Sequence, residues 1–117
     1  MDIEIIRNYC LNKKGTDEGF PFNEETIVFK VMGKIFLLTN IELTDSINLK
    51  CDPETAIDWR ERYDAVKPGF HMNKTHWNTV ELDGSIPDNK ILEMIDHSYD
   101  MVVKGLKKTD KEKLAKL

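Results

Sequence analysis

The sequence lacks most of the features that mark specialised classes of protein. Cysteine occurs only twice in 117 residues, Gly and Pro number 6 and 4, and no apolar run approaches the roughly 20 residues that a membrane-spanning helix needs. Disulfide-rich, collagen-like and membrane-spanning proteins are thereby excluded. The chain also lacks an excess of positive charge, because 17 Lys and Arg oppose 21 Asp and Glu and leave a formal net charge of -4. This composition is typical of an ordinary globular domain.

The N-terminus lacks the basic and then apolar pattern of a secretory signal between Met1 and Glu4. We therefore expect a cytoplasmic protein, in which a disulfide between Cys10 and Cys51 would not persist. Both cysteines are predicted to be buried, reduced side chains. Neither belongs to a Cys/His cluster with the spacing of metal ligands, so the sequence predicts no metal site and no cofactor.

The first half of the chain is predicted to form a helix followed by strands. Apolar residues recur at Ile3, Ile6 and Cys10, a spacing typical of an amphipathic helix. With Asp2 as its N-cap, this helix is predicted over residues 2–13. A loop is predicted over 15–25 and strands over 26–32, 34–39 and 46–51, with a two-residue hairpin turn at Met32-Gly33.

The second half is predicted to begin with a helix and a hairpin. Asp52-Pro53 combines an N-cap with proline at the first helical position, which favours a helix as far as Tyr63. Pro68-Gly69 indicates a turn. The strands of the hairpin are predicted over 70–72 and 76–82, around Asn73-Lys74-Thr75.

The last predicted element is a long helix that covers the sheet. Its broad apolar stripe runs from Ile91 to Leu106, and Gly105 suits its end. The order of elements predicts an α+β fold whose antiparallel sheet packs its helices mainly on one face. Residues 1–106 are predicted to form this single domain, and residues 107–117 to form a mobile basic tail.

Several short motifs follow one another along the chain in a distinctive order. They are Phe20-Pro21-Phe22, the run from Val28 to Phe36, the run from Asn48 to Pro53, Arg60 to Tyr63, Pro68 to Lys74, His76 to Val80, Asp83-Gly84-Ser85 and Asp96 to Tyr99. In these motifs the chain resembles the MmcQ/YjbR family of small bacterial proteins. The resemblance implies a fold similar to that of frataxin-like (CyaY-like) proteins and a DNA-binding role described as a double-wing motif. It implies no catalytic residue.

The DNA-binding hypothesis centres on the hairpin at residues 70–80, with double-stranded DNA as the partner. The residues able to contact phosphates or base edges there are Lys50, Lys67, His71, Asn73, Lys74, His76 and Asn78. Net charge opposes tight binding, because the sequence pI is about 5.4 and segment 50–76 has equal numbers of acidic and basic residues. In the alternative interpretation, Asn73 only makes the turn and Lys74 only contacts solvent. Trp77 is predicted to lie in the core rather than to stack on a base.

Two other functions stay open at this stage. A frataxin-like fold suggests iron binding by carboxylates, for which the candidates are Asp2, Glu4, Asp17, Glu18, Glu24 and Glu25. A face around His71, Asn73, His76 and Asn78 would suit a protein partner or a small ligand. The two histidines are predicted to be hydrogen-bonded side chains and Ser98 has no context of a nucleophile, so no enzyme activity is predicted.

Overall fold

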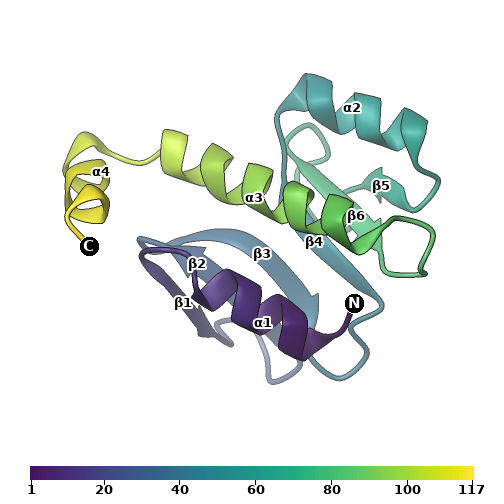
Figure 1. Cartoon of the computed structure of the whole chain (residues 1–117), viewed down its shortest axis with the longest axis horizontal. Coiled ribbons are helices and arrows are strands. Elements are labelled where there is room, and N and C mark those ends of the chain that lie inside the picture. The colour runs from purple at the N-terminus through teal and green to yellow at the C-terminus, as the bar shows by residue number, and fades with distance from the viewer.

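Strands occupy the centre of the chain, and helices lie near both of its ends (Figure 1). This computed structural model describes residues 1–117, and its helices are α1 (Ile3–Leu11), α2 (Pro53–Arg62), α3 (Asp88–Lys104) and α4 (Lys108–Ala115). Its strands are β1 (Thr16–Gly19), β2 (Thr26–Val31), β3 (Lys34–Asn40), β4 (Ser46–Lys50), β5 (Val66–Pro68) and β6 (Trp77–Glu81). The predicted α+β fold with an antiparallel sheet is confirmed.

All the strands join one antiparallel sheet in the order β1-β2-β3-β4-β6-β5. In its centre, Leu49 of β4 lies between Leu37 of β3 and Asn78 of β6. Lys50 follows Leu49, Trp77 precedes Asn78, and the two residues pair with each other. Because side chains alternate along a strand, Lys50 and Trp77 lie together on the opposite face of the sheet. We call the face of Leu49 and Asn78 the covered face and that of Lys50 and Trp77 the open face.

Helices α1, α2 and α3 pack on the covered face. Fully buried side chains of the core come from both layers: Ile6, Cys10, Met94 and Ile95 from helices, and Phe29, Phe36, Leu37 and Ile47 from strands. Each of the larger apolar side chains stabilises the fold by about 1.5–3 kcal/mol through its removal from water. None of the helices combines the length and apolar character that crossing a bilayer requires.

The beginnings of α1 and α2 follow the predicted capping residues. The Oδ1 atom of Asp2 accepts a hydrogen bond from the backbone N–H of Ile5 at 3.0 Å. The Oδ2 atom of Asp52 accepts two, from the N–H groups of Glu54 and Thr55, both at 3.2 Å. Such caps satisfy N–H groups that have no partner inside the helix, which confirms both predicted starts.

The prediction of a loop over 15–25 is wrong for its first part, which forms strand β1. The strand pairs with β2 from Thr16 opposite Val31 to Gly19 opposite Val28. Strand β1 is an edge strand that pairs through backbone hydrogen bonds, and such strands do not need apolar side chains. Its side chains are mostly polar, so the sequence shows no apolar alternation there. The predicted turn at Met32-Gly33 is confirmed, and both residues adopt the positive φ that a two-residue hairpin favours.

The second hairpin is shifted relative to its prediction. Strand β5 ends at Pro68, and residues 70–72, predicted to be a strand, belong to a long loop that reaches β6 at Trp77. Within this loop the Oδ1 atom of Asn73 accepts hydrogen bonds from the N–H groups of Thr75 and His76, at 2.9 and 3.3 Å. That local turn takes the backbone groups that strand pairing would have needed.

The segment predicted as a basic tail contains helix α4. Leu114 of this helix is only 7% exposed and belongs to the hydrophobic core cluster. It packs where β1 begins, because a Cβ atom added to Gly15 would lie 2.7 Å from its Cδ1 atom. One buried apolar side chain in eight residues leaves almost no periodic pattern, so the sequence does not reveal this helix.

Candidate functional site

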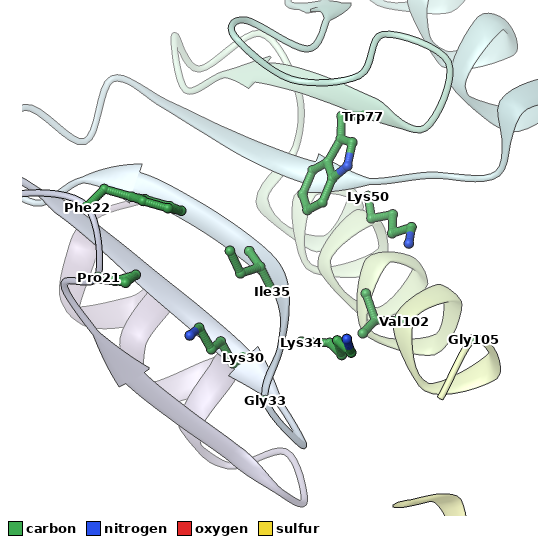
Figure 2. Close-up of a pocket in the computed structure, with 10 residues that line it drawn as sticks. All are labelled: Pro21, Phe22, Lys30, Gly33, Lys34, Ile35, Lys50, Trp77, Val102 and Gly105. Carbon is green, nitrogen blue, oxygen red and sulfur yellow. The ribbon is translucent and has the colours of Figure 1, made fainter. Parts of the chain in front are cut away.

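Two adjoining hollows lie where the open face meets the end of α3, and Figure 2 shows the larger of them. Their volumes are about 590 and 490 Å³, and both are lined by Lys50, Trp77 and Gly105. We call the combined depression the lysine groove. Its other lining residues are Pro21, Phe22, Lys30, Gly33, Lys34, Ile35, Asn73, His76, Met101, Val102 and Lys104.

The lysines of the groove come from different elements that the fold brings together. Lys30 lies in β2, Lys34 begins β3, Lys50 ends β4 and Lys104 ends α3. A β-bulge shifts the register between Phe29 and Lys30, so that Lys30 pairs with Ile35, another lining residue. Convergence of these side chains therefore depends on sheet register and on the length of α3.

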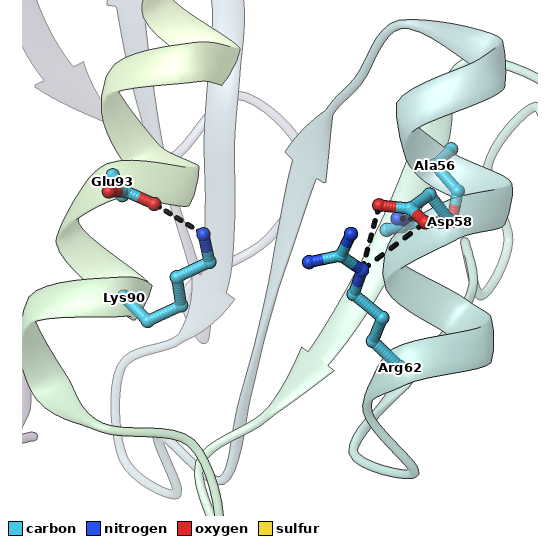
Figure 3. Close-up of polar contacts among 6 residues, drawn as sticks. Ala56, Asp58, Arg62, Lys90 and Glu93 are labelled. Atoms are coloured by element: carbon cyan, nitrogen blue, oxygen red, sulfur yellow. Dashed lines mark hydrogen bonds and ion pairs between the residues drawn. The ribbon is translucent and has the colours of Figure 1, made fainter.

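Within the groove itself no carboxylate balances this positive charge; Asp17 of β1, which lies opposite Lys30 in the sheet, lines a neighbouring hollow with it. Neither hollow is lined by an Asp or Glu residue, and Lys30, Lys34, Lys50 and Lys104 form no ion pair. Other basic side chains do have partners, such as Lys90 with Glu93 and Arg62 with Asp58 (Figure 3). The groove is thus a concentration of unneutralised positive charge on a chain whose formal net charge is -4, an arrangement that attracts anions.

Aromatic and apolar side chains accompany the lysines. Trp77 is half-buried, Phe22 is 65% exposed, and Figure 2 shows both rings and Ile35 lining the same hollow as Lys50. Contrary to the prediction, Trp77 lies outside the core, because its register with Lys50 places it on the open face. Its indole N–H donates no hydrogen bond within the protein and is free for a ligand.

The opposite end of the open face carries acidic residues. There a third hollow, of about 530 Å³, is lined by Asp45, Glu81 and Asp83 together with Lys67. The ammonium group of Lys67 lies 2.6 Å from a carboxylate oxygen of Glu81, and this hydrogen bond raises the pKa of the lysine. We call this region the acidic hollow. The sign of the charge therefore changes along the face.

The structure brings three of the residues predicted for DNA binding to the lysine groove. These are Lys50, Asn73 and His76. Lys67 lies in the acidic hollow instead, paired with Glu81. The Nζ atom of Lys74 donates a hydrogen bond to the carbonyl oxygen of Gly69 at 2.9 Å and so ties the loop to itself.

The other two candidates lie elsewhere. His71 has a φ of 57° and packs against exposed Phe70, with 4.1 Å between the ring centroids and an angle of 53° between the ring planes. Asn78 is buried on the covered face, where its Oδ1 accepts from Arg60 Nε at 2.7 Å and its Nδ2 donates to the carbonyl of Ala56 at 3.3 Å. Its amide therefore holds α2 to the sheet and faces away from any ligand on the open face.

Sequence reasoning missed four contributors to the groove: Phe22, Lys30, Lys34 and Lys104. Lys30 and Lys34 flank the predicted turn at Met32-Gly33, so their proximity was available from the hairpin signal. Lys104 falls within the predicted long helix, whose apolar stripe ends beside it, but it was not among the residues predicted to bind DNA. The position of Phe22 depends on the loop after β1, which has no periodic pattern.

The groups considered for metal or nucleophilic chemistry are dispersed or buried. No group of three or more His, Cys, Asp or Glu side chains is close enough to hold a metal ion, and the acidic candidates for iron do not converge. Burial raises the pKa of Cys10 and of Cys51 to about 12. Ser98 is buried, where its Oγ donates to the carbonyl of Phe36 and accepts from the N–H of Lys50 at 2.8 Å.

These features define a small α+β domain whose antiparallel sheet is covered by helices on one face and bears a basic groove on the other. A family model described as YjbR matches residues 11–101. The chain belongs to the YjbR (MmcQ) family.

Relatives from several bacteria share most of their length with this chain. It is 33% identical to YjbR of Escherichia coli K12 over 100% of both chains, and 38% identical to YbdF of E. coli O157:H7 over 95% of this chain and 92% of that one. A crystal structure of a Deinococcus radiodurans protein with a DUF419 domain superposes with a TM-score of 0.90 at 36% identity, covering 97% of this chain and 88% of that one. A Pseudomonas syringae structure gives a TM-score of 0.73 at 26% identity, over 86% of this chain and 98% of that one.

Proposed function

We propose that this chain is a DNA-binding domain that holds the phosphate backbone in the lysine groove, without catalysing a reaction. One observation carries the proposal: lysines from β2, β3, β4 and α3 line a concave surface whose lining contains no carboxylate, and none of these lysines forms an ion pair. Contacts from Lys and Arg to phosphate supply most of the affinity of proteins for nucleic acid. The groove is the place on this chain where such contacts can gather.

The proposed contact lies beside the tip of the hairpin rather than on it. Of the predicted residues, Lys50, Asn73 and His76 face the groove, whereas the ammonium group of Lys74 is hydrogen-bonded to Gly69 and Lys67 is paired with Glu81. The loop thus forms one wall of the groove. In this arrangement Asn73 and His76 lie next to Lys50, where they can bind the backbone or a base edge.

The acidity of the whole chain is compatible with this proposal. A net charge of -4 opposes adhesion of a polyanion to the general surface, so binding depends on the local field of the groove. The affinity should therefore be moderate and sensitive to salt. The slope of log K against log salt should be about −0.9 for each phosphate that a lysine neutralises on a duplex.

Fluorescence anisotropy with a labelled DNA duplex at two salt concentrations tests the proposal. The variant Lys34→Ala/Lys50→Ala removes two groove charges, and Lys14→Ala/Lys111→Ala removes two exposed charges outside the groove as a matched control. We expect the groove variant to bind more weakly, with a salt slope smaller in magnitude by about one per lost contact, and the control to bind almost as the parent does. Equal losses in both variants would refute the proposal, as would a parent that binds DNA neither as a duplex nor as a single strand.

A further inference from the structure

We infer that the groove receives an unpaired nucleic-acid strand, with phosphates on the lysines and a base stacked against Trp77. This inference rests on the proposed function and specifies its ligand. It begins from the position of Trp77, which lies on the open face and outside the core. The side chain is half-buried there, so part of the indole surface is open to a ligand.

The surroundings of Trp77 suit the face of a base. Phe22 and Ile35 line the same hollow, so the space beside the indole is partly apolar, while Lys30, Lys34 and Lys50 also line it. An unpaired nucleotide matches these surroundings, because it combines an aromatic base with a negatively charged phosphate group close to it. Proteins that bind single strands combine these elements, aromatic platforms for bases and a basic groove for the backbone.

A duplex would use only half of this arrangement. Its bases are stacked on one another and paired, so it offers phosphates to the lysines but no base face to Trp77 or Phe22. The volume of the larger hollow, about 590 Å³, is in the range of pockets that enclose small ligands and suits a single nucleotide. The indole N–H, which has no partner within the protein, can donate a hydrogen bond to an unpaired base or to a phosphate oxygen.

Three labelled ligands distinguish this inference from simple charge attraction. They are a single-stranded oligothymidylate, an abasic deoxyribose-phosphate oligomer of the same length, and a duplex, each of about 12 nucleotides so as to exceed the site. The abasic oligomer has the same phosphates as the oligothymidylate but no base. Anisotropy titrations of the full chain with all three, at one salt concentration, measure the contribution of the bases directly.

We expect the oligothymidylate to bind roughly 5- to 150-fold more tightly than the abasic oligomer, because stacking of one base contributes about 1–3 kcal/mol. The variant Trp77→Leu, which keeps an apolar side chain, should lose this difference between the oligothymidylate and the abasic oligomer. Circular dichroism checks that the variant is folded, and the abasic comparison on the parent does not depend on it. Equal binding of all three ligands would overturn the inference and leave the proposed function standing. Binding of none would overturn both.

Discussion

Arg60 of α2 and Asn78 of β6 are joined by a hydrogen bond of 2.7 Å from the guanidinium Nε to the buried amide Oδ1. The same guanidinium also donates to the carbonyl oxygens of Lys74 and Trp77. A single side chain therefore connects the helix, the last strand before α3, and the loop that forms one wall of the lysine groove. Its removal should affect stability and binding together.

The variant Arg60→Met should destabilise the fold by about 1–3 kcal/mol, because Asn78 is left with a buried acceptor that has no partner. Urea unfolding followed by circular dichroism measures this loss. Arg62→Met is the matched control, since Arg62 pairs only with Asp58 on the surface and such exposed pairs contribute little (Figure 3). Equal midpoints for the two variants would contradict the assigned role of Arg60.

Stability should fall in mild acid because of His97. Burial lowers the pKa of this imidazole despite the opposing charges of Asp52 and Asp100, and its Nε2 accepts the backbone N–H of Asp52 at 3.1 Å. The unfolded chain binds a proton near pH 6.5 that the folded chain binds only at lower pH. The free energy of unfolding should thus be highest above this pH and decrease as the pH falls toward the folded-state pKa.

Chemical denaturation at a series of pH values measures this dependence on His97. The variant His97→Gln, which cannot titrate, should show a flatter profile between neutral and mildly acidic pH. His71→Gln serves as control, because His71 is exposed and makes no such hydrogen bond. The assignment to His97 fails if the two variants have the same profile.

Ser98→Ala should reduce stability by about 1–3 kcal/mol, since the carbonyl of Phe36 and the N–H of Lys50 both lose a buried partner. It should also weaken DNA binding under the proposed function, because the backbone of Lys50 is no longer fixed to α3. Thermal unfolding and anisotropy measure the two effects. Ser85→Ala, in an exposed turn with Asp83, provides the comparison. A variant as stable as the parent would show that these hydrogen bonds are dispensable.

Neither thiol should react with a disulfide reagent while the chain is folded. Cys10 and Cys51 are buried, and a pKa raised to about 12 leaves almost no thiolate at neutral pH. With a reagent that releases a chromophore when it reacts with a thiol, release should be slow in buffer. Both cysteines should react rapidly once urea unfolds the chain. Fast labelling of either thiol in the native protein would show that the region around it opens readily.

Local signals in the sequence were sufficient to predict much of the fold. The alternation from Ser46 to Lys50 predicted a half-buried strand, and Asp52-Pro53 predicted the start of α2, because each of these signals is contained in a few adjacent residues. Strand β1 and helix α4 were not predicted. The edge strand is stabilised by backbone pairing, and the helix is anchored by Leu114 alone, so neither produces an apolar pattern.

The candidate site was less predictable than the fold. Lys50 was identified, but its neighbours depend on distant relationships: Trp77 joins it through the β4–β6 register, and Lys104 through the position of α3. The strand alternation of β6 alone would allow Trp77 to face either side. Only the register with β4 decides between the core and the open face.

The change from negative to positive charge along the open face also limits the length of nucleic acid that one molecule can bind. Strand β4 runs from Ser46, at the acidic hollow, to Lys50 in the lysine groove, a span of roughly 13 Å at 3.3 Å per residue. At the rise of about 3.4 Å per nucleotide of a stacked strand, a polyanion lying along it meets repulsion after roughly four nucleotides, and a more extended strand after fewer. The length of nucleic acid bound by one molecule is therefore short, because each binding site ends at the acidic hollow. A long single strand would be occupied by many copies of the protein.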